Sequence, residues 1–369
     1  MSHPSIFDLS NQIDTQTFLN EYWQKKPCVI KGAWPDFECP IDENELAGLS
    51  LEQEVESRII SNIENNWQVQ QGPFEEDVFA KLPEQNWTLL IQGCDQLNDE
   101  IHALRGYFDF LPSWLLDDVM ISFATDQGSV GPHYDQFNVF LLQASGKRTW
   151  HLAKDDYKTK PEFIEPLPVK VLKTMPQYER FDVGNGDLIY IPPGFAHHGV
   201  SQGNSTSLSF GYRGPSISET FGQVGFTVDE NTDEFSRLAF LKSEQHSSRI
   251  DQTHIEQTRQ QIMNTLTDDM ITQFLGHNFT ELKEPMACVN ASIDELEEAF
   301  GNSGVLYKSL NARMAYTEQW LFANGEKFKL NEQTAILLCE QSEISLNDLS
   351  INHLDLIHEL IELGVFDFE

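Results

Sequence analysis

The sequence predicts an α+β protein in which a double-stranded β-helix, or jelly-roll barrel, precedes a helical segment and a small mixed domain. Short runs rich in β-branched and aromatic residues, separated by Gly and Pro turns, recur between residues 87 and 214. Such spacing is typical of a barrel. Beyond Pro215 the apolar spacing becomes helical, and further on helices and strands alternate. These changes of pattern predict three domains, at 1–216, 217–285 and 286–369.

The charge balance limits the class of partner. The chain carries 58 acidic and 24 basic residues, which gives a net charge of −34. We expect no direct nucleic-acid partner, because binding phosphates requires a basic face. A strongly acidic surface would attract a basic protein or peptide. Solubility, or adaptation to a salty or cold habitat, would produce the same charge.

Nothing in the sequence resembles a targeting or membrane segment. The first twelve residues, MSHPSIFDLSNQ, lack the basic and apolar regions of a signal peptide, and no run of eighteen apolar residues occurs. Five cysteines, without a CxxC pair, indicate reduced thiols in a cytoplasmic protein. They are Cys28, Cys39, Cys94, Cys288 and Cys339.

Short helices and strands lead up to the barrel. Phe18, Tyr22 and Trp23 form the apolar side of a predicted helix over 14–23, which Pro27 ends. The other elements predicted up to residue 125 are a strand at 28–30, a helix at 41–57, a strand at 87–93, a helical link at 112–118 and a strand at 119–125.

One run within the barrel has the residue types of a metal site. If residues 133–141 form a strand, its alternation puts His133 and Asp135 on one face, where both can bind the same ion. The third ligand would be His197 or His198. We favour His197, because it follows the Pro-Pro-Gly turn with the suitable spacing and His198 would point away. Two histidines and a carboxylate form the facial triad of non-haem Fe(II) oxygenases, although chance and core histidines explain most His-x-Asp triplets.

A cation follows at the start of the next predicted strand, after the bend at Gly146-Lys147. Arg148 shares its face with Trp150, so it is expected to point into the barrel. A cation facing an apolar interior needs an anion. A dicarboxylate cosubstrate would supply one through a bidentate ion pair. Pairing with an internal acid is the alternative, and Lys147 on the other face is the weaker candidate.

Three more runs complete the predicted barrel, at 169–174, 181–194 and 207–214. Beyond them, Ser216 and Glu219 form a possible capping box that opens helical sequence, including a helix at 251–266. These helices carry too few apolar residues for a core of their own, so we expect them to pack on each other or on a second subunit.

The last 84 residues of the sequence resemble a small winged-helix module. A helix ending at Gly301, strands around the Asn324-Gly325 hairpin turn and two closing helices make up the pattern. Winged helices usually bind DNA, yet 286–369 holds fifteen acidic and four basic residues. A role in protein contact is therefore the better prediction.

The two motifs GPHYDQFNVFLLQASGKRTWHL and GDLIYIPPGFAHHGV resemble the JmjC-type, cupin-like 2-oxoglutarate oxygenases. The chain is most similar to the bacterial ribosomal oxygenase group, which hydroxylates an arginine of a large-subunit ribosomal protein. The resemblance covers nearly the whole chain. FLNEYWQKKPCVIKGAW resembles the family's N-terminal segment, and the two later domains resemble its dimerisation and C-terminal modules.

The resemblance implies roles for particular residues. His133, Asp135 and His197 match the iron ligands, and Arg148 matches the residue that holds the distal carboxylate of 2-oxoglutarate. Ser122 matches a position that lines the cosubstrate or substrate pocket. Ser207 stands where relatives have an amide side chain, and His198 stands where they have an acid. The implied cofactors are Fe(II) and 2-oxoglutarate, and the implied partners are a basic protein substrate and a second copy of the chain.

Other classes of function remain open from the sequence. A cupin isomerase or dioxygenase would usually carry a His-x-His pattern, which Asp135 argues against. A non-catalytic metal-binding scaffold would not need Arg148 to face inward. Among oxygenases, another basic protein could be hydroxylated, or a methylated lysine demethylated.

Overall fold

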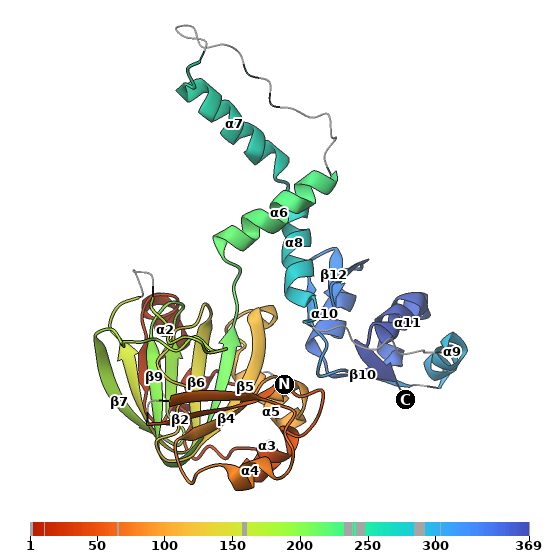
Figure 1. Ribbon diagram of the computed structural model, residues 1–369. Coiled ribbons are helices and arrows are strands. Elements are labelled where there is room, and N and C mark those ends of the chain that lie inside the picture. The colour runs from red at the N-terminus through yellow and green to blue at the C-terminus, as the bar shows by residue number, and fades with distance from the viewer. Residues whose placement is uncertain are drawn as a thin grey trace. The chain divides into compact units, whose positions relative to one another are not determined.

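The computed structural model describes residues 3–10, 12–64, 66–156, 161–231, 238, 240, 248–283, 292–302 and 304–368. The chain divides into two compact units, Met1–Gly214 and Pro215–Glu369 (Figure 1). The first boundary predicted from the sequence, at 216/217, lies within two residues of this division. The second, at 285/286, falls between described segments and stays a prediction. Cys288 also lies outside the described residues.

An antiparallel sheet of nine strands forms the body of the first unit, in the order β1-β8-β6-β9-β5-β4-β2-β3 with β7 paired to β6. Its strands curve round into a barrel (Figure 1). Their bounds are β1 Cys28–Ile30, β2 Ser57–Ile63, β3 Asn66–Gln71, β4 Trp87–Ile91, β5 Leu116–Ala124, β6 Asn138–Ala153, β7 Tyr178–Gly184, β8 Leu188–Ile191 and β9 His197–Tyr212.

The two longest strands, β6 and β9, lie side by side in the sheet. They pair along almost their whole length, with register shifts around Ser145. At the bend Gly146 adopts φ +65°, and a Cβ there would lie 2.1 Å from the carbonyl oxygen of Asn204, so only glycine fits. On its other edge, β6 pairs with β8 before the bend and with β7 after it. The prediction of a new strand beginning at Arg148 was therefore wrong, because β6 continues through the bend.

Short helices cover the barrel. They are α1 Ile6–Ser10, α2 Thr15–Glu21, α3 Glu43–Leu49, α4 Val78–Lys81 and α5 Asp99–Ala103. Aromatic side chains join them to the sheet: the ring of Phe18 on α2 lies 5.5 Å from Phe140 and 4.9 Å from Tyr190, measured between centroids. All three rings are almost completely buried. They form part of the main apolar core of the unit.

Three further predictions in this unit were wrong in part or in whole. The helix predicted over 41–57 ends at Leu49, and β2 begins at Ser57. Residues 112–118 contain only the 3-10 turn Ser113–Leu115 before β5 begins. Residues 169–174 form no strand, and only an isolated bridge joins Leu172 to Phe163.

The second unit joins three helices to a mixed domain. Its helices are α6 Ile217–Asn231, α7 Gln252–Thr265, α8 Asp268–Thr280, α9 Ile293–Gly301, α10 Glu332–Glu340 and α11 Leu354–Glu362. Its strands are β10 Val305–Lys308, β11 Met314–Tyr316, β12 Trp320–Ala323, β13 Glu326–Lys329, β14 Glu343–Ser345 and β15 Phe366–Phe368. Helix α8 packs on the β11–β13 sheet, with Gly276 close against the ring of Phe322.

The local signals read from this part of the sequence appear as predicted. The backbone N–H of Ser216 donates to the Glu219 carboxylate at 2.7 Å, and the Glu219 N–H donates to the Ser216 hydroxyl at 3.1 Å. Asn324 and Gly325 connect β12 to β13. None of the helices in the described ranges has both the length and the apolar character needed to span a bilayer.

Candidate metal centre

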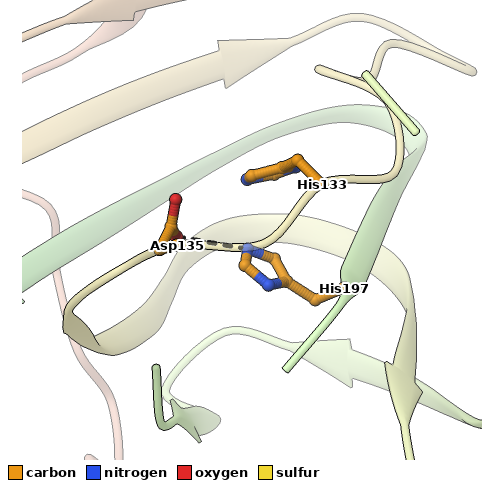
Figure 2. A group of neighbouring side chains, drawn as sticks. All are labelled: His133, Asp135 and His197. Atoms are coloured by element: carbon orange, nitrogen blue, oxygen red, sulfur yellow. Dashed lines mark ion pairs between the residues drawn. The ribbon is translucent and has the colours of Figure 1, made fainter. Parts of the chain in front are cut away.

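Three polar side chains converge inside the barrel. Figure 2 shows His133, Asp135 and His197 pointing toward one another. Each offers one ligand atom, and these atoms all lie within 4.8 Å of one another. The Nε2 atom of His197 lies 3.5 Å from a carboxylate oxygen of Asp135. Two imidazoles and one carboxylate at such distances can bind a divalent transition metal on one side of its coordination sphere.

The chain brings these residues together differently from the prediction. His133 and Asp135 precede β6, which begins at Asn138, so they do not share the face of a strand. Instead, the backbones of His133 and His197 exchange two hydrogen bonds, of 3.0 and 2.8 Å. The N–H of Gly194 also donates to the carbonyl of Asp135 at 2.9 Å. Pairing with the start of β9 therefore holds the His133–Asp135 segment beside the third residue.

Backbone carbonyls orient both imidazoles. The Nδ1 atom of His133 lies 2.9 Å from the carbonyl oxygen of Gly131, and that of His197 lies 3.1 Å from the carbonyl oxygen of Phe195. Since a carbonyl can only accept, each Nδ1 carries the proton and each Nε2 keeps its lone pair for a metal. Burial, together with the neighbouring His133, lowers the pKa of His197 to about 4. His197 is therefore neutral, the form that binds metal, at physiological pH.

Arg148 is a buried cation in the same part of the barrel. Its side chain donates to the hydroxyl and carbonyl oxygens of Ser122 and Ser205, at 2.8–3.2 Å. Burial lowers its pKa to about 10, which leaves it charged at neutral pH. Within the described residues no carboxylate forms an ion pair with it, so the alternative of an internal acid finds no support. Lys147 is exposed.

One cavity of about 450 Å³ joins all these groups. Six of its lining residues are those predicted from the sequence: Ser122, His133, Asp135, Arg148, His197 and Ser207. The hydroxyl of Ser207 donates to the side-chain oxygen of Gln143 at 2.9 Å. His198 does not line the cavity, and its ring lies against that of His151 with 5.6 Å between centroids.

Other lining residues were missed from the sequence. Asp118, Met120 and Ser122 alternate along β5 and all line the cavity, so counting back in twos from Ser122 would have found Asp118. Asp118 pairs with Gly211 across β5 and β9. A Cβ on Gly211 would lie 3.6 Å from the Asp118 carboxylate. The absence of a side chain at Gly211 therefore leaves space beside that carboxylate.

Comparisons with known proteins agree with this fold. Residues 103–220 match the model of the JmjC domain, and residues 254–367 match that of the ROXA-like winged helix. The chain is 30% identical, over 370 residues, to the ribosomal protein uL16 3-hydroxylase of Escherichia coli, covering 95% of this chain and 97% of that protein. The chain belongs to the ribosomal oxygenase family of JmjC proteins. Membership confirms the predicted fold class, including the winged-helix end.

One more relative and one solved structure extend the comparison. The chain is 31% identical over 339 residues to a "Probable ribosomal oxygenase" of Haemophilus influenzae, covering 87% of this chain and 83% of that protein. The solved structure of the E. coli ribosomal oxygenase YcfD in complex with cobalt and 2-oxoglutarate superposes with a TM-score of 0.79. That match has 28% identity and covers 97% of this chain and 99% of YcfD. These likenesses support the prediction of a 2-oxoglutarate-dependent oxygenase.

Proposed function

We propose that this ribosomal oxygenase homologue uses Fe(II), 2-oxoglutarate and O2 in the cytoplasm to hydroxylate an arginine of the large-subunit ribosomal protein uL16. The observation that carries the proposal is the joint presence, around one cavity, of three side chains that could hold a metal ion and the buried Arg148. The full-length likeness to the E. coli uL16 3-hydroxylase supports the choice of substrate.

Each polar group would have a distinct part in this reaction. His133, Asp135 and His197 would hold the iron, and Arg148 would pair with the distal carboxylate of 2-oxoglutarate. Together with O2, the bound iron and cosubstrate supply the oxidant that inserts one oxygen atom into a C–H bond. Ser122 and Ser205 fix the guanidinium through the hydrogen bonds described above. Ser207, on the same wall, would complete the polar lining near the cosubstrate.

The apolar wall of the cavity would limit what else can react. Val139, Leu141 and Trp150 line it and are buried. They exclude water from the neighbourhood of the metal, so the oxidant meets the side chain that the substrate presents.

Arg58 and Lys170 also line the cavity, so a cationic side chain of the substrate would lie beside Asp118, on the opposite strand from Gly211. Met120 and Phe137 offer apolar contact for an aliphatic stem. Asp118, whose carboxylate already accepts from the Gly93 N–H at 3.2 Å, adds a negative charge beside the space left by Gly211. A carboxylate attracts a guanidinium, which stays charged at neutral pH, more strongly than it attracts a neutral imidazole. We therefore rank arginine above histidine as the target.

The proposal predicts a specific change in the mass of uL16. Incubating purified E. coli uL16 with the protein, Fe(II), 2-oxoglutarate and air should add one oxygen atom per molecule, and fragmentation should locate it on an arginine. Omitting 2-oxoglutarate serves as the control. Succinate release without modification of uL16 would contradict the proposed substrate, and oxygen on a different residue type would contradict the arginine assignment.

We further propose that the chain forms a homodimer through helices α6–α8. Large apolar side chains lie exposed there: Phe221, Phe226 and Met263 are 67%, 63% and 65% exposed. None of the residues of α7 is buried. Monomeric proteins seldom leave so much apolar surface uncovered, and an identical face on a second copy would cover it.

This second proposal predicts the sedimentation behaviour. At micromolar concentration the protein should sediment as a dimer, and a Phe221→Asp, Phe226→Asp double variant should sediment as a monomer. Gln223→Asp, on an exposed position of the same helix, is the matched control and should remain dimeric. A monomeric native protein, or a double variant that still dimerises, would exclude this interface.

A further inference from the structure

A second cavity, of about 530 Å³, lies next to the metal centre. Six residues line it: Tyr134, Pro161, Glu162, Phe163, Glu165 and Lys173. Tyr134 lines the first cavity as well. Since Tyr134 stands between His133 and Asp135 in the chain, the second cavity begins at the metal-binding segment itself.

The wall between the two cavities is a small lobe, residues 161–173, in the connection from β6 to β7. Two backbone segments form it and are joined by hydrogen bonds: Ile164 N–H donates to the Val171 carbonyl at 2.8 Å, and Lys173 N–H donates to the Glu162 carbonyl at 2.9 Å. Residues 168–171 of the lobe line the metal cavity. Its other side, which includes Glu162 and Glu165, lines the second cavity.

The lobe is fixed to the metal-binding segment. The N–H of Leu172 donates to the carbonyl of Pro132 at 2.7 Å, one residue before His133. The rings of Phe163 and Tyr134 lie 6.2 Å apart between centroids. Leu172 is buried in a small apolar cluster with Phe163 and Tyr134 at its edge. The positions of the two cavities relative to each other are therefore set by local packing.

The lining of the second cavity suits a basic side chain. Its two carboxylates are exposed, and its one cation, Lys173, lies 3.7 Å from Glu162. Within the described part of the chain, Glu165 forms no ion pair. Half-buried Tyr134 and Phe163 add aromatic surface. A Lys or Arg side chain can lay its aliphatic stem on such rings and direct its charge to a carboxylate.

We propose that this second cavity binds a basic side chain of the substrate protein, close in sequence to the residue presented to the metal centre. This inference rests on the proposed function, since it takes the occupant to be a basic protein. The lobe is two paired backbone segments wide, roughly 5 Å between their axes. An extended substrate chain advances about 3.3 Å per residue. A residue two to four positions from the target can therefore reach across the lobe.

Charge reversal in the second cavity tests the proposal. The variant Glu162→Lys, Glu165→Lys is compared with Glu52→Lys, Glu54→Lys, whose residues are also exposed and belong to the same unit but do not line either cavity. Both variants change the net charge equally. We expect the KM for uL16 to rise about tenfold in the first variant alone, as two local attractions become repulsions. The KM for 2-oxoglutarate and kcat at saturating uL16 should stay unchanged.

A binding measurement separates this inference from the proposed function. Fluorescently labelled uL16 is titrated with each variant loaded with Mn(II) and 2-oxoglutarate under argon, where no turnover occurs. Weaker binding by the Glu162/Glu165 variant alone supports the second cavity, whether or not uL16 is hydroxylated. Two outcomes would overturn the proposal. An equal loss of affinity for uL16 in both variants would show that only the overall charge matters, and no loss of affinity in either variant would show that the second cavity does not bind uL16.

Discussion

Replacing Asp135 by alanine should abolish the hydroxylation of uL16 while the protein stays folded. Asp135 offers the only negative charge among the three converging side chains, and 31% of its side chain is exposed. The hydrogen bond that fixes its backbone is accepted by its carbonyl, which the substitution leaves in place. Loss of a group that only supports a metal ligand already costs about 10–100-fold in affinity or activity. Loss of a ligand itself should cost at least as much.

The matched control for this substitution is Gln136→Ala, one residue further on and exposed. Fe(II) binding, succinate formation and the mass of uL16 are measured for both variants, with thermal unfolding as the check on folding. The Gln136→Ala variant should bind Fe(II), form succinate and add oxygen to uL16 as the native protein does. Near-native succinate formation by a folded Asp135→Ala protein would show that Asp135 is not a metal ligand.

Replacing Arg148 by methionine should raise the 2-oxoglutarate concentration needed for half-maximal rate by several hundredfold or more, with little effect on Fe(II) binding. Removing one partner of a buried charge pair costs about 3–5 kcal/mol, because the remaining charge is left buried without compensation. Methionine keeps much of the length of the side chain, so the cavity should not collapse. The hydroxyls of Ser122 and Ser205 lose a partner, so we also expect some loss of thermal stability.

Lys147→Met is the control for this second substitution, since Lys147 is the neighbouring cation on the same strand and is exposed. Initial rates are measured across a 2-oxoglutarate series for both variants. The proposed role of Arg148 fails if its substitution hardly changes the 2-oxoglutarate requirement, or if Lys147→Met changes it as much.

Local signals in the sequence predicted the elements that depend on neighbouring residues. The Ser216–Glu219 capping box and the Asn324-Gly325 turn each act within four residues, and both occur as predicted. By contrast, β2 and β3 were missed. The spacing of Leu46 and Leu49 extends a helical pattern toward residue 57, and β3 is a mostly polar strand at the edge of the sheet, with little hydrophobic alternation to identify it.

For the candidate site, residue types were predictable but the geometry was not. His133 and Asp135 were chosen because they would share the face of a strand, yet they converge through backbone pairing with His197, 64 residues further on. That contact leaves no local pattern in the sequence. Similarly, alternation predicted that Arg148 faces inward. Only the three-dimensional structure shows that its nearest polar neighbours are serines and carbonyls rather than an acid.

Anaerobic visible spectroscopy tests most directly whether His133, Asp135 and His197 bind Fe(II) in a cavity that also takes 2-oxoglutarate. Adding 2-oxoglutarate to the Fe(II)-loaded protein should produce a weak charge-transfer band. The band should be missing from Asp135→Ala and should need far more 2-oxoglutarate in Arg148→Met. Admitting air with uL16 should remove the band and yield succinate and hydroxylated uL16 in equal amounts. The absence of any band from the native protein, or an undiminished band from Asp135→Ala, would contradict the proposed metal centre.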